Sequence, residues 1–319
     1  MKTAKFLLCI ICITIIYSCN NSGKKSVTSD NLQGTISISG AFALYPMTVR
    51  WSEEFRKLYP DVKIDISAGG AGKGMADALS EMVDLGMFSR EVSEQEIAKG
   101  AWYIAVTKDA VLPTINAANP FINDLKKQGI TLNQLKRLYI DGKVKNWEDI
   151  LDIPGEHKIN VYTRSDACGA AAMWGKYLGV NQEDLLGLGV FGDPGVADAV
   201  KSDIYGIGYN NVIYVYDINT RLKYKDLEVL PLDLDSNGII DGDENFYDRL
   251  ESISQAIKNE IYPSPPAREL YLVSQGKPKN PAAVKFIEWI LTEGQQFVKE
   301  AGYVKLATDR ISDELKKLE

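Results

Sequence analysis

Histidine is almost missing from this sequence: His157 is the only one among 319 residues. A metal centre or a proton relay made of several histidines is therefore not expected. Positive charge is also scarce, because 36 Lys and Arg face 43 Asp and Glu, which gives a net charge of −7. This balance argues against a nucleic-acid partner, which usually requires a basic surface. With 45% hydrophobic and 25% charged residues, the composition is globular, and the length suits two lobes.

A run of apolar residues long enough to cross a membrane is lacking too. Residues 6–17 are apolar apart from Thr14, but a membrane-spanning helix needs about 20 residues. Lys2 and Lys5 precede this run, as in a secretory signal. The run closes on Ser18-Cys19, which resembles the lipobox of bacterial lipoproteins. We therefore predict a signal peptide at residues 1–18, a lipid on Cys19 that holds the protein to a membrane, and a tether at residues 19–33. An ordinary signal peptide cut nearby is the alternative.

Cysteine is scarce in the chain that follows the predicted signal peptide. Cys9 and Cys12 leave with the predicted leader and Cys19 takes lipid, so only Cys168 stays in the mature body. A disulfide framework is therefore excluded. Cys168 with His157 could suggest a nucleophile and its base, but a lone cysteine is usually structural. We expect no enzyme, no catalytic residue and no catalytic cofactor.

Strands and helices alternate along the body. Strands are predicted at residues 35–39, 62–67, 83–88, 102–106, 159–162, 207–209 and 212–215, and helices from residue 46 and at 72–82, 170–178 and 285–300. A loop is predicted at residues 113–119. Two capping boxes are predicted, one formed by Ser93 and Glu96 and the other by Thr131 and Gln134. This alternation predicts an α/β protein of two lobes, each a mainly parallel sheet flanked by helices. No linker is visible, so the chain should cross between the lobes, with lobe 1 at 34–105 and 211–319 and lobe 2 at 106–210.

Three turns rich in glycine or hydroxyl groups follow predicted strands and precede predicted helices, at residues 40–46, 69–74 and 164–170. In a parallel sheet such turns lie at the carboxyl ends of the strands, where ligands bind. Helix starts present unpaired backbone N–H groups, so three converging turns would make an anion site. Each alone could be an ordinary turn. The middle turn is not a nucleotide P-loop, because Ser67 stands where the first glycine of that motif belongs.

The order of these turns, with residues 84–90 and the stretch from 262 to 303, resembles the phosphate-binding proteins of bacterial phosphate ABC transporters, which are class II periplasmic binding proteins. The resemblance spans nearly all of residues 34–306. It implies a two-lobed fold that binds one dehydrated phosphate in the cleft between the lobes. It also implies an ABC permease as partner and a place on the periplasmic side of the cell envelope.

The same resemblance implies the binding residues. Arg164 would donate to the phosphate, and Asp166 would orient Arg164. The other expected ligand-binding residues are Ala43, Leu44, Tyr45, Ala71, Gly72, Ser89, Arg90, Cys168, Gly169 and Ala170.

Several of these positions depart from the family pattern. Leu44 and Ala170 replace threonines, Cys168 replaces a serine, and Arg90 replaces the aspartate that accepts the proton of phosphate. These changes should affect the binding of an oxyanion less than they affect the selectivity for phosphate. Sulfate or another tetrahedral oxyanion is therefore an alternative ligand.

A second motif is independent of this family. Residues 233–244 match the calcium-loop pattern D-x-[DN]-x-[DN]-G-x5-E at each fixed place. The expected ligands of a structural Ca²⁺ are Asp233, Asp235, Asn237, the carbonyl of Ile239, Asp241 and Glu244. An acidic surface loop that matches by chance is the simpler interpretation. An adhesive surface lipoprotein stabilised by calcium is the alternative for the whole chain.

Overall fold

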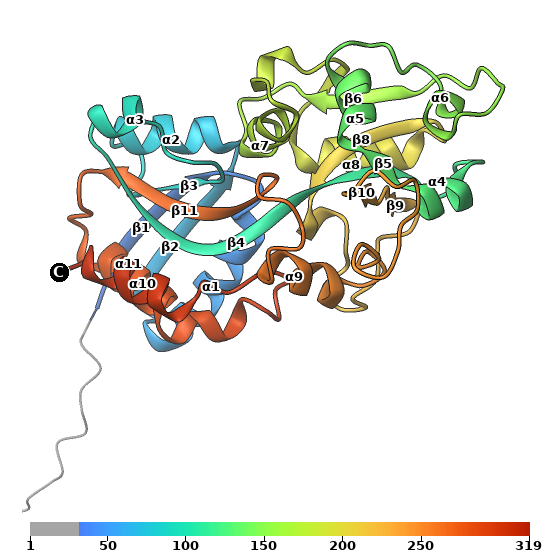
Figure 1. Cartoon of the computed structure of the whole chain (residues 1–319). Helices are drawn as coiled ribbons and strands as arrows, with labels where there is room; N and C mark the ends of the chain where they lie inside the picture. Colours follow the sequence, from blue (N-terminus) through green and yellow to red (C-terminus); the bar gives the residue numbers. More distant parts are fainter. Residues whose placement is uncertain (1–31) are drawn as a thin grey trace, which may run out of the picture. The chain divides into compact units, whose positions relative to one another are not determined.

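The computed structural model describes residues 32–319. The predicted signal peptide, Cys19 and most of the tether lie outside these residues. The described chain is built on one nine-stranded sheet with the order β2-β1-β3-β11-β4-β8-β6-β7, and β9 also pairs with β4. The 16-residue strand β4 runs through both halves of this sheet and joins them (Figure 1).

The strands are parallel at the two ends of the sheet and antiparallel in its middle. β1 pairs in parallel with β2 and β3, and β6 with β7 and β8, whereas β11 and β4 run antiparallel to their neighbours. A separate two-stranded parallel sheet joins β5 and β10. The strands are β1 (Gly34–Gly40), β2 (Val62–Ala68), β3 (Leu85–Phe88), β4 (Ala101–Asn116), β5 (Ile130–Thr131), β6 (Asn160–Arg164), β7 (Leu188–Val190), β8 (Gly206–Asn211), β9 (Leu227–Val229), β10 (Leu232–Asp233) and β11 (Ala267–Gln275).

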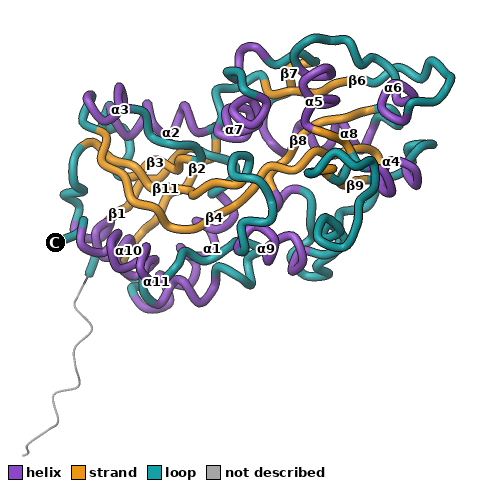
Figure 2. Tube along the Cα trace, viewed as in Figure 1, coloured by secondary structure: helices purple, strands orange, loops and turns teal. Residues whose placement is uncertain are grey.

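Helices cover both faces of the sheet. In Figures 1 and 2, α2 and α3 lie on one face of the first half, and α1, α10 and α11 on the other. Among the described residues, no helix combines the length and the apolar character needed to cross a membrane. The helices are α1 (Tyr45–Leu58), α2 (Ala71–Leu79), α3 (Glu94–Ala98), α4 (Ile122–Gln128), α5 (Leu132–Tyr139), α6 (Trp147–Leu151), α7 (Gly169–Leu178), α8 (Gly192–Ser202), α9 (Leu250–Lys258), α10 (Pro281–Leu291) and α11 (Thr308–Lys316).

Two separate hydrophobic cores define two lobes, and the predicted α/β class is confirmed. One core includes Ile36, Trp51 and Phe286, and the other includes Trp147 and Tyr209. The second core also contains most of the buried side chains between residues 215 and 262, which the sequence placed in lobe 1. The reason is that β9 pairs with the distal end of β4, so the chain stays with the second lobe until β11 returns it to the first.

Local signals in the sequence predicted most of the elements, with three exceptions. One is the predicted helix at 285–300, which ends at Leu291 and is followed by a 3₁₀ helix, Glu293–Phe297. Both predicted capping boxes are present. The predicted strand at 212–215 is instead a 3₁₀ helix, Val212–Tyr214. The predicted loop at 113–119 begins inside β4, where Pro113 pairs opposite Tyr209. Proline is tolerated there because its carbonyl accepts the amide of Leu230 and the position needs no donor.

Candidate functional site

The three predicted turns meet where the two lobes face one another. The amides of Gly69 and Gly70 both donate to the carbonyl of Gly40, which joins the first two turns. The amide of Gly72 donates to the carbonyl of Ala167 at 3.0 Å, which joins the second turn to the third across the lobes. The structure therefore brings together Gly72 and Ala167, which lie 95 residues apart in the sequence.

Glycine makes these close approaches possible. A Cβ added at Gly169 would collide with the carbonyl and hydroxyl oxygens of Ser89, and one at Gly72 would lie 2.8 Å from the Cβ of Ala167. Gly70 precedes α2 with φ of 88°, a conformation that other residues adopt at a cost. The starts of α2 and α7, and the end of β3, can thus pack backbone against backbone. The first amides of each helix have no partner within that helix.

Arg164 is the charged centre of this arrangement, and its side chain is fully buried. Its Nε donates to Asp166 Oδ1 at 2.8 Å, and its Nη2 to Asp166 Oδ2 at 2.6 Å. This two-pronged contact holds the guanidinium plane in place, because both groups are planar and of matching width. Arg164 also lies over the ring of Phe42 at 5.6 Å. The expected pairing of Asp166 with Arg164 is present.

A second carboxylate on Arg164 was missed by the sequence analysis. Asp193 Oδ2 accepts from Nη1 of Arg164 at 2.5 Å, and Asp193 is 2% exposed. It lies in the first turn of α8, after Gly192, which has φ of 76°. This strand–turn–helix is of the same kind as the other three, so the glycine at the start of α8 was the signal that could have revealed it.

Asp193 is also one end of a buried polar chain that reaches the first lobe. Its Oδ1 accepts from Asn211 Nδ2 at 2.6 Å, and Asn211 Oδ1 accepts from Arg268. Arg268 further donates to the carbonyl of Ser89 and faces Asp109 at 3.7 Å. Burial raises the pKa of Asp109 to about 6, although Arg268 opposes this shift. The network holds two arginines and three carboxylates, so its arginines balance all but one of its negative charges.

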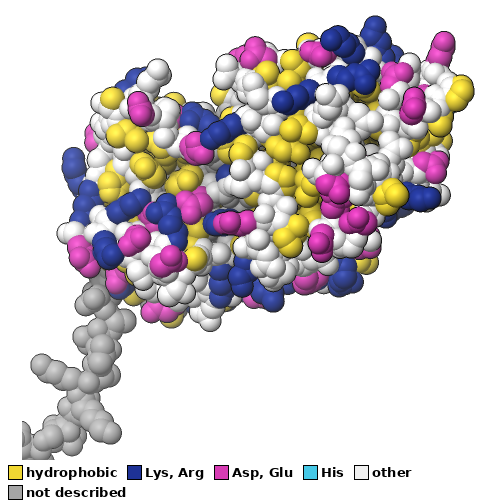
Figure 3. All heavy atoms as spheres, viewed as in Figure 1, with side chains coloured by type: hydrophobic (Ala, Val, Ile, Leu, Met, Phe, Trp, Pro, Cys, Tyr) yellow, Lys and Arg dark blue, Asp and Glu magenta, His cyan; other side chains and the backbone are white. Residues whose placement is uncertain are grey.

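Arg90 lies at the rim of this region, paired within its own lobe. Its guanidinium contacts both oxygens of Glu96, at 3.0 and 2.7 Å, and lies 4.5 Å from the ring centre of Phe88. It lines a pocket of about 680 Å³ between the lobes, together with Gly72, Cys168 and Lys176. Space-filling atoms show charged side chains of both signs interspersed on the visible face (Figure 3). Arg90 is thus near the interlobe opening, but its charge is already balanced.

The remaining predicted residues of the first turn contribute backbone. Ala43 and Leu44 are buried, and Tyr45 is half-buried at the start of α1. The hydroxyl of Tyr303 donates to the carbonyl of Ala43 at 2.8 Å. The hydroxyl of Tyr214 donates to the carbonyl of Phe42, so a residue after β8 also holds this turn. With Ala71, Ser89 and Ala170 buried too, the site offers amides and one guanidinium rather than many side-chain donors.

Cys168 caps a helix. Its Sγ accepts from the amide of Ala171 at 3.3 Å. Burial raises the pKa of its thiol to about 12, and Arg164 only partly offsets this. The thiol is therefore protonated at neutral pH and is a poor nucleophile. His157 pairs instead with Glu148 and packs against Phe121 and Tyr205. The two residues that could have made a catalytic pair have separate structural partners.

The predicted calcium ligands lie elsewhere, in the segment that begins with the last residue of β10, Asp233. Ligand oxygens of Asp233, Asp235 and Glu244 lie within 4.8 Å of one another. Asp241 is outside this group. Asn237 Oδ1 accepts from the amide of Ile239 at 2.8 Å.

Comparison with known proteins identifies the family. A domain described as a PBP superfamily domain matches residues 25–293. The chain belongs to the PBP superfamily. It is 28% identical to the phosphate-binding protein PstS of Methanocaldococcus jannaschii, over 95% of this chain and 91% of that protein. It is 23% identical to PstS of Staphylococcus aureus strain USA300, over 91% of this chain and 84% of that protein.

A solved structure supports the fold of this PBP superfamily member. A putative phosphate ABC transporter substrate-binding protein from Clostridium perfringens, with bound phosphate, is 23% identical and has a TM-score of 0.71. The match covers 86% of this chain and all of that one. The expected likeness to phosphate-binding proteins of phosphate transporters is confirmed. In this PBP chain, two of the four strand–turn–helix units belong to the first hydrophobic core and two to the second, and Arg164 lies where their turns meet.

Proposed function

We propose that this protein is the substrate-binding component of a phosphate ABC transporter, which captures inorganic phosphate between its lobes and delivers it to a permease. Arg164 carries this proposal. It is a fully buried guanidinium held by Asp166 at the point where three helix starts meet. A buried guanidinium together with helix-start amides that lack a partner within their own helix is a site for an oxyanion. The PstS relatives support phosphate as that oxyanion.

Asp193 is our candidate for the residue that distinguishes phosphate from sulfate. At neutral pH phosphate retains a proton, whereas sulfate has none. An anion that contacts Arg164 comes close to a carboxylate that shares the same guanidinium, Asp193. Protonated phosphate can donate to such a carboxylate, whereas sulfate would only be repelled by it. Asp193 would thus replace the proton acceptor that Arg90 cannot provide.

Calorimetric titration of the purified protein with phosphate and with sulfate, near pH 6 and near pH 8, tests both ideas. We expect phosphate to bind and sulfate to bind at least about tenfold more weakly, because a hydrogen bond that becomes a repulsion costs more than about 1.4 kcal/mol. Asp193→Asn should reduce the ratio of phosphate affinity to sulfate affinity. Asp198→Asn, an exposed carboxylate on the same helix, is the matched control.

Sulfate, or another tetrahedral oxyanion, is the second candidate ligand because an arginine stands at position 90. Equal binding of both anions, or a preference for sulfate, would replace phosphate in the proposal and leave the oxyanion site intact. If neither anion produced heat or raised the melting temperature, the transport proposal would be wrong. An adhesive lipoprotein would then be the better hypothesis.

The location and partner are also proposals. The lipobox-like sequence at Ser18-Cys19 supports a lipid anchor at the cell envelope, and the family likeness supports an ABC permease that recognises the closed form. The thiol of Cys168 is protonated at neutral pH, which supports a role of this protein in binding rather than in catalysis. Metabolic labelling with palmitate should mark the wild-type protein, and Cys19→Ala should abolish the label.

A further inference from the structure

The segment at residues 233–244 has no role in the proposed oxyanion site. It holds five acidic residues and no basic one. It begins at Asp233, the last residue of β10, and ends at Glu244. Gly238 takes φ of 80° in its middle, where the calcium-loop pattern requires a glycine for a sharp turn. The backbone therefore follows the bend that the sequence pattern predicts.

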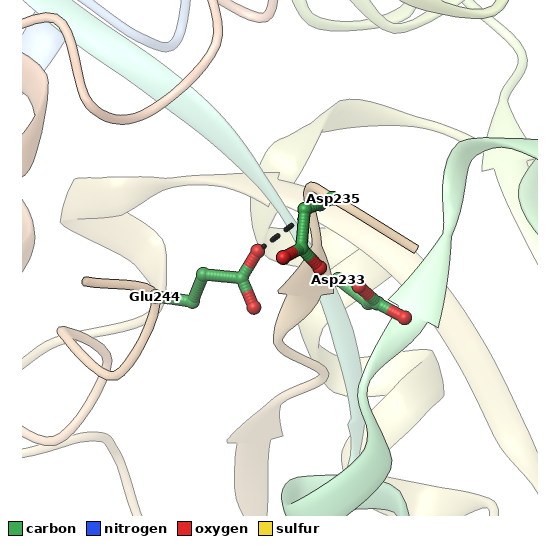
Figure 4. Close-up of side chains that lie close together, drawn as sticks. All are labelled: Asp233, Asp235 and Glu244. Atoms are coloured by element: carbon green, nitrogen blue, oxygen red, sulfur yellow. Dashed lines mark hydrogen bonds between the residues drawn. The ribbon is translucent and has the colours of Figure 1, made fainter. Parts of the chain in front are cut away.

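The structure directs three carboxylates of this segment toward one another. Figure 4 shows Glu244 reaching toward Asp235 and Asp233. Backbone amides hold each one: Gly238 donates to Asp233 at 2.9 Å, Asn237 to Asp235 at 3.0 Å and Leu234 to Glu244 at 2.7 Å. The loop thus fixes the position of at least one oxygen on each side chain.

One oxygen in this cluster is buried without a partner. Glu244 is 6% exposed, and its Oε2 makes no hydrogen bond. Asp233 is 3% exposed. Among the ion pairs of the described residues, none involves Asp233, Asp235 or Glu244. Buried carboxylates that face one another without a counter-charge are costly, so this cluster calls for a positive charge.

We propose that residues 233–244 form a binding site for one Ca²⁺. Asp233, Asp235, Asn237 and Glu244 would supply side-chain oxygens, and Ile239 its carbonyl. Asp241, which lies outside the group of three, stands at the ninth position of the loop, where coordination often runs through a water molecule. The donors are all oxygen, which suits calcium, magnesium or manganese better than zinc or copper. Calcium also tolerates an irregular shell better than magnesium does.

The contacts of the loop indicate what the bound ion would stabilise. The amide of Ile240 donates to the carbonyl of Lys127 at 2.8 Å, and the side chain of Ile240 packs on Gly129. β10 pairs with β5, the strand that comes directly after α4 along the chain. Calcium would therefore hold α4 and β5 of the second lobe in place. This assignment does not depend on the identity of the transported anion.

Titration of the purified, chelator-treated protein with CaCl₂ tests this site, with MgCl₂ as the comparison. We expect one calcium per chain with a dissociation constant between about 10⁻⁶ and 10⁻³ M, and weaker magnesium binding. At calcium about a hundredfold above that constant, the melting temperature should rise by about 5 °C. The absence of both calcium heat and a thermal shift would overturn the proposal.

Variants locate the bound ion. Glu244→Gln and the exposed Asp235→Asn should each weaken calcium binding at least about tenfold, because each removes a charged ligand. Asp243→Asn removes one exposed negative charge from the same loop at a position that is not a ligand, and it should bind as the wild type does. Asp235→Asn keeps the test valid if Glu244→Gln does not fold. Calcium binding that none of the three alters would place the ion elsewhere and refute the assignment.

Discussion

The oxyanion site and the calcium loop both contain buried carboxylates, but they differ in what neutralises them. Asp166 and Asp193 share Arg164, and Asp109 faces Arg268. In the calcium loop, by contrast, Asp233 and Glu244 are buried without any basic partner. Each carboxylate of the first region already has an arginine beside it, so a ligand there competes with existing pairs. The second is electrostatically incomplete until a cation arrives. Without any ligand, the stability of the protein should therefore be limited by the calcium loop rather than by the oxyanion site.

The largest effect should follow the removal of Arg164. Arg164→Ala would leave Asp166 and Asp193 buried without their cation, which makes the first region resemble the second. We expect the free energy of unfolding to fall by about 3–5 kcal/mol, and oxyanion binding to be lost. Urea unfolding and calorimetry measure the two effects. Arg137→Ala, at an exposed arginine, should change neither. A stable Arg164→Ala protein would show that the aspartates do not depend on this charge.

The second effect concerns pH and Asp109. Its folded-state pKa of about 6 lies above the ordinary 3.8, because burial outweighs Arg268. Between these values the folded protein binds more protons than the unfolded chain does. The contribution of Asp109 to the free energy of unfolding therefore falls as pH rises from about 4 to 6, by at most about 3 kcal/mol, and is level above that.

Asp109→Asn removes this titration and allows it to be measured. The difference in unfolding free energy between the wild type and the variant should decrease from pH 4 to pH 6 in urea titrations. A difference that stays constant with pH would mean that Asp109 is ionised throughout, as a well-paired carboxylate would be. That outcome would show that Arg268 neutralises the charge of Asp109 more fully than their distance of 3.7 Å indicates.

The two regions also differ in how much of each could be predicted. Every candidate ligand of the calcium loop was visible, because twelve consecutive residues carry the whole pattern. For the oxyanion site, the turns at residues 40–46, 69–74 and 164–170 were predicted, since each carries a local strand–turn–helix signal. Asp193 and Arg268 were missed, because their importance comes from partners that the fold brings together from other elements. Packing likewise placed residues 215–262 in the second lobe, and no local pattern marks that choice.

A third, moderate effect comes from glycine. Gly169→Ala places a Cβ against the backbone carbonyl of Ser89, which cannot yield as a side chain can. We expect a loss of about 1–3 kcal/mol of stability, and oxyanion affinity at least about tenfold weaker. Gly242→Ala in the calcium loop is the matched control, since a Cβ there meets nothing within 4 Å. It should leave the melting temperature in calcium unchanged. Equal effects of both variants would show that Gly169 matters only through backbone freedom.

The smallest expected effect is the coupling between the two regions. Within residues 32–319, no hydrogen bond or ion pair joins the Arg164 network to the calcium loop. Changes at sites that share no partner usually add within about 0.5 kcal/mol. Asp193→Asn and Glu244→Gln should therefore destabilise the double variant by the sum of their separate effects in urea unfolding with calcium present. Phosphate affinity should also stay within about twofold when calcium is removed. A coupling above about 1 kcal/mol would mean that the ordering of α4 and β5 by calcium changes the oxyanion site through the core of the second lobe. Calcium would then change the affinity for the anion as well as the stability of the protein.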